Sequence, residues 1–329
     1  MKRWKIVVFS STIASTLLLG SCVYWRLEPS RHFDQSELPV VSMPEEIQNE
    51  SSEALTHDGI QNSSLSPAFT PSSTQSFNVL LLGIDARGNE NSRSDVIMVI
   101  HVIPSDKKAN VLSVPRDTRV NLRNVGYTKI NHAHALGEAK GGSHQGTEAT
   151  MQAVSDFLRI PINYYLKTDF KGFEHFIDAV GGVEVELKQQ LHLRSTQKDL
   201  PAGKQRIGGA TALSLVRERW AFPEGDFGRQ NAQYQVLRSI VQEALAPKNM
   251  KKTISLIAGI KKDLIDTNFR DSDIISLAWM LEDMKASDFQ YSQIPGRSGY
   301  DLDPIEHTQL YYWIPDMAEV KEIVEELFS

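Results

Sequence analysis

Acidic and basic side chains gather at three places in this sequence where an apolar run begins or ends. These residues are Asp85 and Arg87, then Arg93 and Asp95, then Arg116. A pair of carboxylates suits Mg²⁺, which takes oxygen ligands and shares its coordination with substrate phosphates. Arginine side chains bind phosphate oxygens through two parallel hydrogen bonds. The residue types therefore predict a site for a hard cation and a phosphate-containing substrate.

A second polar group lies further along the chain, from Arg217 to Gln233. Arg217 and Arg219 are two positions apart, and residues with that spacing do not share a face of a helix. If both side chains point into one site, the chain must be extended or turning at Glu218. The alternative is a solvated charged surface, which local composition alone favours equally.

The elements that must position these residues are strands of a buried sheet. Continuous apolar runs predict strands at 77–83, 96–103 and 109–114, and such runs are typical of a sheet covered on both faces. Two further strands are expected at 164–168 and 183–187, where the second alternates like an edge strand. Helices are predicted at 147–158, 170–180, 210–218, 229–245, 253–264, 271–284 and 315–328. The predicted fold is an α/β domain with a central mixed sheet flanked by helices. Because ligands of such sheets bind at strand ends, the polar residues are placed where a site is expected.

The N-terminal residues 1–25 are predicted to target the membrane. A basic flank precedes residues 6–24, which contain no charged side chain and are just long enough to span a bilayer. One interpretation is an uncleaved, single-pass anchor with the C-terminal domain outside the cell, as the positive flank indicates. The other is a lipoprotein signal, because residues 19–22 resemble a lipobox ending in Cys22. Both interpretations place the bulk of the chain outside the cell, held at the outer face of the cell membrane.

Composition separates the remaining chain into two parts and limits its partners. Residues 26–76 are rich in Ser, Pro, Glu, Gln and Asn, so we expect a disordered linker, followed by a catalytic domain at 77–329. The net charge of −6 argues against a general nucleic-acid binder. Cys22 is the sole cysteine of the 329 residues, which excludes an internal disulfide and a cysteine-based zinc site.

Six motifs, taken in order, resemble the LytR-CpsA-Psr family of cell-wall ligases. They lie at 81–85, 93–95, 113–118, 129–131 with Ala133, 178–183, and 216–219 with 225–229 and Gln233. Together they span about residues 77 to 245. The resemblance implies a phosphotransferase that moves a glycopolymer from an undecaprenyl-pyrophosphate carrier to peptidoglycan and forms a phosphodiester. The polymer, whether teichoic acid, capsule or another secondary wall polymer, is not specified by these motifs.

The resemblance also implies roles for the matching residues. Asp85 and Asp95 would hold Mg²⁺ at the pyrophosphate. The groups acting on the pyrophosphate oxygens would be Arg93, Arg116, Arg217, Arg219 and Gln233, while Lys129 and Arg229 would bind substrate in the same pocket. The lipid tail would occupy an apolar tunnel between sheet and helices. One departure from the family pattern is Ala232, which stands where a second arginine is common.

Two other functions use the same residues. With water as the acceptor, the pocket would belong to a pyrophosphatase or phosphatase acting on polyprenyl pyrophosphates. Without catalysis, the chain would sense lipid-linked precursors as an envelope regulator. Paired carboxylates and several arginines favour catalysis over binding alone, whereas ligase and hydrolase differ only in the nucleophile that enters.

Some conspicuous residues have simpler interpretations. Asp117 and Thr118 are expected to satisfy the local backbone of a turn. Trp279, Tyr311 and Trp313, with Tyr312, are interpreted as core or surface aromatics, with a sugar platform as the alternative.

Overall fold

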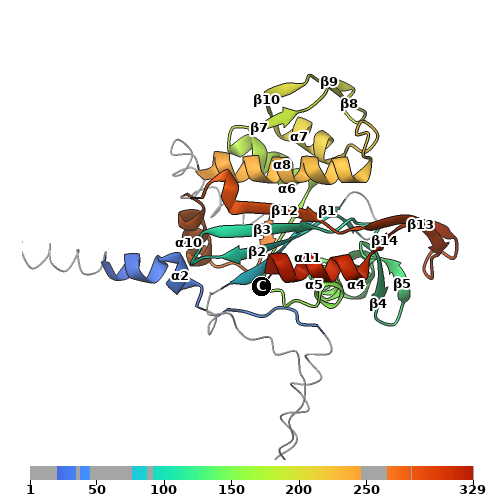
Figure 1. Cartoon of the computed structure of the whole chain (residues 1–329), viewed down its shortest axis with the longest axis horizontal. Coiled ribbons are helices and arrows are strands. Elements are labelled where there is room, and N and C mark those ends of the chain that lie inside the picture. Colours follow the sequence, from blue (N-terminus) through green and yellow to red (C-terminus); the bar gives the residue numbers. More distant parts are fainter. Residues whose placement is uncertain are drawn as a thin grey trace, which may run out of the picture.

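The computed structural model describes residues 21–34, 38–44, 76–86, 92–245, 265–282 and 284–328. At its centre is a six-stranded sheet with the strand order β11-β6-β1-β2-β3-β12 (Figure 1). The strands are β1 (Phe77–Asp85), β2 (Arg93–Ile103), β3 (Lys108–Ser113), β6 (Tyr164–Asp169), β11 (Ile265–Thr267) and β12 (Phe289–Gln293). Strand β1 is antiparallel to β2 and parallel to β6, while β3 is parallel to β12. The predicted central mixed sheet is therefore confirmed.

One face of the sheet is covered by α4 (His132–Gly141), α5 (Ser143–Leu158) and α11 (Met317–Phe328). Alternate residues of β1 point into this layer, because successive side chains of a strand point to opposite faces. Leu80 and Leu82 are fully buried there. The opposite face lies beneath α6 (Phe170–Ala179) and α8 (Asp226–Leu245) (Figure 1). The sheet is thus flanked by helices on both sides, as predicted.

A smaller lobe lies on the far side of α6 and α8. It contains β7 (Val183–Leu187), β8 (Leu191–Leu193), β9 (Lys198–Leu200), β10 (Gly203–Ile207) and α7 (Gly209–Arg217). Its own apolar cluster includes Val185, Leu193, Leu215 and Val236. Ala232 belongs to this cluster and is 5% exposed. Ala232 therefore lies in an apolar core and is not among the residues that line the cavity described below.

Two further strand pairs extend beyond the six-stranded sheet. One is β4 (Arg119–Leu122) with β5 (Gly126–Lys129), and the other is β13 (Gly296–Leu302) with β14 (Gln309–Pro315). Figure 1 shows the β13–β14 pair as a long arm that reaches beyond the helices. The remaining short elements are η2 (Ala286–Asp288), α10 (Asp271–Glu282) and α2 (Pro29–His32).

Two stretches of the predicted disordered linker pack against the rest of the structure. Phe33, which follows α2, is 1% exposed, and its ring lies 4.5 Å from that of Phe77. Ser42 forms an isolated β-bridge with Ile162. The structure differs here from the prediction for 26–76. The prediction used the average composition of the segment, which is low in large apolar residues. An average does not show that a single aromatic side chain, Phe33, is buried.

Several predictions concern residues that lie outside the described ranges. The N-terminal part of the predicted anchor, residues 1–20, and the predicted helix at 253–264 belong to this group. None of the helices in the described ranges has an apolar stretch long enough to cross a bilayer. Cys22 lies within the described residues and is exposed.

Candidate active site

A cavity of about 500 Å³ lies between the sheet and the helices α6, α8 and α10. Most of its wall is apolar. The lining includes Leu81, Met98, Phe173, Leu213, Leu237, Ile240 and Leu277. Such a space suits a hydrocarbon chain, because apolar ligands gain free energy when their surface leaves water.

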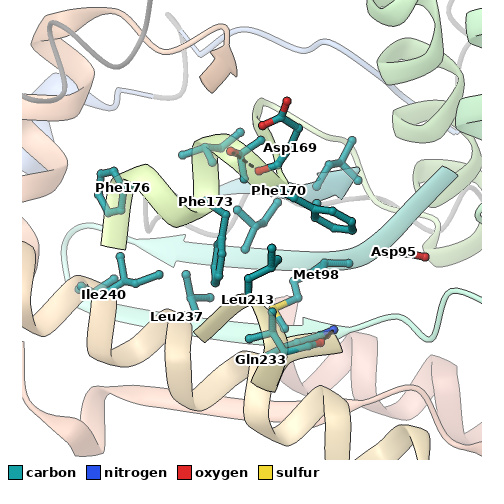
Figure 2. Close-up of a pocket in the computed structure, with 18 of the residues that line it drawn as sticks. Asp95, Met98, Asp169, Phe170, Phe173, Phe176, Leu213, Gln233, Leu237 and Ile240 are labelled. Carbon is teal, nitrogen blue, oxygen red and sulfur yellow. Dashed lines mark hydrogen bonds between the residues drawn. The ribbon is translucent and has the colours of Figure 1, made fainter. Parts of the chain in front are cut away.

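Helix α6 supplies an aromatic wall to this cavity. Phe170, Phe173 and Phe176 recur every three residues and therefore share a face of the helix. Figure 2 shows the Phe173 ring beside Leu237 of α8 and the Phe176 ring on the side of Ile240, whereas the Phe170 ring extends toward Met98 and Asp95. The helix is fixed at its start, since the Asp169 carboxylate accepts a hydrogen bond of 2.8 Å from the Gly172 backbone N–H.

Charged and polar side chains line the same cavity. They are Asp95, Arg116, Arg217, Arg219, Arg229 and Gln233, together with Thr168, Asp169 and Thr267. Figure 2 shows Asp95 and Gln233 toward one end of the cavity, with Phe176 and Ile240 toward the other. The cavity therefore matches an amphiphile that joins an apolar chain to an anionic group.

A β-bulge turns Asp95 into the cavity. Gly83 pairs with Val96, but the next residue, Ile84, pairs with Ser94, so Asp95 is an extra residue on β2. Ile84 and Ser94 are buried on the core face, whereas Asp95 and Val96 both line the cavity. Without the bulge, strict alternation would place Asp95 on the core face.

The strands approach closely at this bulge. A Cβ atom on Gly83 would lie 3.0 Å from the Val96 Cβ, tighter than ordinary packing allows. Glycine in a strand interior commonly marks such a close approach or a bulge. The glycine of the motif at 81–85 is therefore explained by the strand geometry that aims Asp95.

Arg116 is held against the cavity by acidic partners. Its Nη1 donates to the Asp95 carboxylate, and its Nε lies 3.8 Å from Asp117 Oδ2. Burial lowers the pKa of the Arg116 guanidinium, but these two carboxylates outweigh that effect and raise it. Arg116 thus stays charged and keeps a fixed orientation.

Asp117 is the acidic centre of the cationic cluster. Its Oδ1 accepts a hydrogen bond of 2.7 Å from Lys129 Nζ, and its Oδ2 lies 3.6 Å from Arg219 Nη2. Burial raises the pKa of this carboxyl, but Lys129, Arg116 and Arg219 together hold it below its usual value. The prediction of a simple turn residue is wrong for Asp117. It is right for Thr118, whose hydroxyl donates to the Pro115 carbonyl at 2.6 Å.

Arg217 and Arg219 both reach the cavity because the chain leaves α7 between them. The helix ends at Arg217, and Glu218 has extended backbone angles of φ −66° and ψ 135°. The Glu218 carboxylate accepts backbone N–H groups of Arg194, Arg219 and Trp220, among others. The guanidinium of Arg217 lies 4.3 Å above the ring centre of Phe170. The predicted extended chain at 218 is confirmed.

Arg229 and Gln233 come from successive turns of α8. The Arg229 side chain is 4% exposed, and its Nη2 lies 2.8 Å from Asp226 Oδ1. Burial lowers the pKa of Arg229, an effect that the nearby Asp226 opposes. Gln233 donates from Nε2 to the Val216 carbonyl at 3.0 Å. Both side chains are therefore fixed before any substrate enters.

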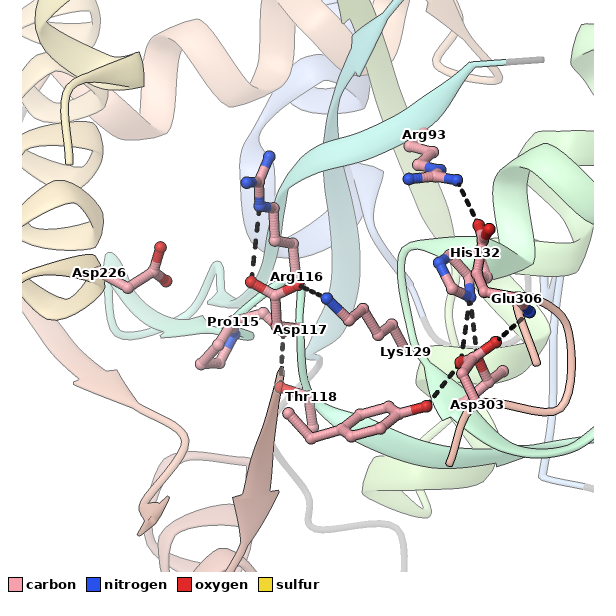
Figure 3. A network of polar contacts seen from close by, with 12 residues as sticks. Arg93, Pro115, Arg116, Asp117, Thr118, Lys129, His132, Asp226, Asp303 and Glu306 are labelled. Carbon is pink, nitrogen blue, oxygen red and sulfur yellow. Dashed lines mark hydrogen bonds and ion pairs between the residues drawn. The ribbon is translucent and has the colours of Figure 1, made fainter. Parts of the chain in front are cut away.

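The position of Arg93 differs from that of the other predicted arginines. Its Nη2 lies 2.9 Å from Glu306 Oε1, and it is absent from the lining of the cavity. Figure 3 shows Arg93 and Glu306 on one side and Arg116 with Asp117 on the other, with Lys129 between them. The structure therefore does not bring Arg93 into the cluster around Asp117.

A buried carboxylate network supports this side of the site. Asp303 is fully buried and accepts hydrogen bonds from the Thr128 hydroxyl at 2.6 Å and the Tyr312 hydroxyl at 2.5 Å. It also accepts the backbone N–H groups of Ile305 and Glu306 (Figure 3). Burial raises the pKa of Asp303, but these hydrogen bonds outweigh it and hold the pKa far below its usual range. The network fixes the turn that carries Glu306 and the strand that carries Lys129.

The charges at the site favour an anion. Five cationic side chains, namely those of Arg116, Lys129, Arg217, Arg219 and Arg229, are grouped with the three carboxylates of Asp95, Asp117 and Asp226. The excess among these eight groups is therefore two positive charges, and Asp169, which also lines the cavity, lies outside the group and caps α6. A pyrophosphate diester, with a charge of similar size and opposite sign, matches that excess.

The two carboxylates predicted to bind metal lie on adjacent strands. Asp85 ends β1 opposite Arg93, and the bulge brings Asp95 to the cavity side of β2. Among the described residues, no group of three or more His, Cys, Asp or Glu side chains is placed to hold a metal ion. Asp95 lines the cavity and Asp85 does not. Mg²⁺ takes few protein ligands and completes its shell with water and phosphate oxygens, so a site for it here remains a prediction.

The sequence of the chain matches a known protein family over most of its length. Residues 41–329 match the LytR_cpsA_psr family. The chain belongs to this family. This LytR_cpsA_psr protein is 32% identical over 249 residues to a polyisoprenyl-teichoic acid–peptidoglycan teichoic acid transferase, TagU, of Bacillus cereus, an alignment that covers 75% of this chain and 77% of the relative.

Solved structures of similar proteins share the fold of this LytR_cpsA_psr protein. TagV of B. subtilis superposes with a TM-score of 0.65 at 28% identity and covers 78% of this chain and 98% of its own. A structure described as TagT bound to LIIa-WTA has a TM-score of 0.63 at 28% identity, with coverages of 82% and 95%.

Proposed function

We propose that this chain is a phosphotransferase that moves a glycopolymer from an undecaprenyl-pyrophosphate carrier to peptidoglycan and forms a phosphodiester bond. The observation that carries this proposal is the apolar cavity with a fixed cationic cluster at its polar end. Membership of the LytR_cpsA_psr family and the names of the teichoic acid transferases similar to it support the same reaction.

The cavity residues bind the carrier and orient it. The polyprenyl chain lies against Phe173 and Leu237, and its burial places the pyrophosphate at Arg116, Arg217 and Arg219. The acceptor hydroxyl oxygen forms the new bond to the phosphorus attached to the glycopolymer, while the bond from that phosphorus to the lipid phosphate breaks. The hydroxyl proton is released in the same reaction.

Charge stabilisation is the main contribution of the arginines. Phosphoryl transfer requires positioning and the neutralisation of charge on the transferring and leaving phosphates. Arg116 and Arg229 are held by carboxylates before substrate arrives, so little reorganisation is needed during the reaction. Arg219 lies 3.4–3.6 Å from the carboxylates of Asp226 and Asp117, which hold its guanidinium at the cavity.

We propose that Asp85 and Asp95 hold Mg²⁺ in this reaction. When bound, the ion supplies further positive charge at the pyrophosphate. Asp95 also orients Arg116, so a single carboxylate connects the cation site to the arginine cluster. Residues 1–25 are proposed to keep the chain at the outer face of the cell membrane, where lipid carrier and wall meet.

A reconstituted reaction tests the proposal. The purified full chain in detergent is incubated with a polyprenyl-pyrophosphate-linked glycan, Mg²⁺ and peptidoglycan oligomers, and products are separated by mass. Glycan joined to muramic acid through phosphate supports the transferase. Free phosphorylated glycan alone, with no joined product, would replace it by a hydrolase.

A further inference from the structure

One face of the β13–β14 arm carries a row of uncharged side chains that includes three aromatic rings. We call this row the aromatic face; it consists of Ser298, Tyr300, Leu302, Gln309, Tyr311 and Trp313. The register pairs Ser298 with Trp313, Tyr300 with Tyr311 and Leu302 with Gln309, so these residues share one side of the strand pair.

The aromatic face is exposed although its residues are partly apolar. Tyr300 is 74% exposed and Leu302 is 60% exposed, whereas Trp313 is half-buried and its Nε1 donates to the Ile294 carbonyl at 3.0 Å. The rings of Tyr300 and Tyr311 contact each other edge to face at 5.8 Å, and the Ser298 and Tyr311 hydroxyls are 3.2 Å apart. Grouped exposed aromatic side chains are typical of binding surfaces.

The opposite face of the arm contacts the rest of the fold through Tyr312 and Asp301, while Arg297 on that face is exposed. Tyr312 is buried and donates to Asp303, while Asp301 pairs with Arg119 of β4 at 2.6 Å. The arm is therefore held to the rest of the fold through one face. Its other face is presented in a fixed orientation, which is the condition for a preorganised binding surface.

The aromatic face begins at the active site. The Trp313 backbone N–H donates to the Asp117 carbonyl at 2.9 Å. The Trp313 ring contacts the Phe227 ring at 4.9 Å, and Phe227 is adjacent in sequence to Asp226 of the cationic cluster. From this point the arm leads away from the cavity (Figure 1).

We propose that the aromatic face binds the glycan strand of the peptidoglycan acceptor. This inference rests on the proposed function and identifies where its acceptor lies. Pyranose rings have apolar C–H faces that pack on Tyr and Trp, and their hydroxyl and acetamido groups hydrogen-bond to side chains such as Ser298 and Gln309. A chain of such sugars along the arm would present a muramic acid hydroxyl at the Trp313 end.

The charge of the face selects this occupant over a phosphodiester polymer such as teichoic acid. None of the six side chains of the aromatic face is charged. A polymer of phosphodiesters needs cations along its path, as phosphate binding elsewhere shows. A glycan backbone of N-acetylated sugars needs aromatic and neutral polar groups, which the aromatic face supplies.

The test is a binding measurement that requires no transfer. Full-length protein in detergent is titrated with peptide-free oligomers of N-acetylglucosamine and N-acetylmuramic acid. The double variant Tyr300→Ala with Tyr311→Ala is expected to lower the affinity about tenfold, equivalent to about 1.4 kcal/mol. The double variant Tyr300→Phe with Tyr311→Phe keeps the rings and should retain binding. Ile275→Ala, a change at an exposed apolar side chain of α10 outside the aromatic face, is the control and should bind as the parent does.

Two results would overturn the proposal. One is parental affinity for the glycan oligomers in the double alanine variant with an unchanged melting temperature. The other is binding of poly(glycerol phosphate), measured in parallel, that falls with the two rings while glycan binding does not. Neither titration contains donor or Mg²⁺. A failed transfer reaction with intact glycan binding would therefore count against the proposed function and leave the acceptor surface standing.

Discussion

Replacing Arg219 by Ala separates catalysis from folding. The guanidinium is 35% exposed and lies 3.4 Å from Asp226 and 3.6 Å from Asp117, so its ion pairs contribute only about 0–1 kcal/mol to stability. Its contribution to phosphate stabilisation is larger. Loss of one preorganised donor to a developing charge typically costs about 10²–10³-fold in rate, or about 2.7–4 kcal/mol. We therefore expect kcat/KM for transfer to fall by about that factor while the melting temperature stays near that of the parent.

The assay follows joined product over time with a polyprenyl-pyrophosphate-linked glycan and peptidoglycan oligomers. Arg219→Lys keeps the charge but loses the planar fork, so its rate should lie between those of the parent and the alanine variant. The matched control is Arg206→Ala, at an arginine that pairs with Glu243 and does not line the cavity. Transfer by Arg219→Ala within about threefold of the parent, at unchanged stability, would refute the assignment of Arg219 to the pyrophosphate.

Further outcomes are expected for the cavity, for Asp303 and for the metal site. Ala278→Phe places a ring in the apolar part of the cavity, so KM should rise more for a long polyprenyl donor than for a short one, measured in parallel. Asp303→Asn should lower the free energy of unfolding by about 3 kcal/mol, because buried donors lose a charged acceptor. The pKa of Asp303 is depressed, so its charge stabilises the fold above about pH 4 and this contribution is lost as the pH falls below that value. The melting temperature of the variant should therefore depend less on pH below about pH 4 than that of the parent. Chelation of Mg²⁺ should stop transfer, and adding Mg²⁺ back should restore it. Asp85→Asn should raise the Mg²⁺ concentration that transfer requires. Activity that survives chelation would remove the metal from the proposal.

The strands at the centre of the sheet were predictable because their residues are apolar without interruption. The runs at 77–83, 96–103 and 109–114 are largely buried on both faces. An uninterrupted apolar run of this length is typical of a strand in a sheet that is covered on both faces. Helix α4 was not predicted, since its sequence from His132 to Gly141 has almost no apolar side and is stabilised by packing against α5. Strand β13 was missed because its exposed, glycine-containing residues carry no alternation.

Site residues could be predicted where their chemical type alone indicates a role. They could not be predicted where the role depends on contacts between residues that are distant in sequence. Arg116, Arg217, Arg219, Arg229 and Gln233 all line the cavity, as the motifs imply. The role of Asp117 depends on Lys129, Arg116 and Arg219 meeting in space, and a short Pro-Arg-Asp-Thr turn does not reveal that. The pairing of Arg93 with Glu306 joins residues more than two hundred positions apart, which one sequence cannot indicate.

The bulge in β2 makes the active site depend on whether a residue count is odd or even. Counting back from Val96, the extra residue Asp95 shifts every earlier position of the strand to the opposite side of the sheet. Deleting Ser94 alone would restore regular alternation and send the Asp95 carboxylate toward the apolar core, although every catalytic residue type would still be present. The active site therefore requires both the right side chains and the extra residue in β2 that sets which face of the sheet each side chain occupies. A relative with one residue fewer between Gly83 and Pro115 would need a compensating irregularity elsewhere to keep the same chemistry.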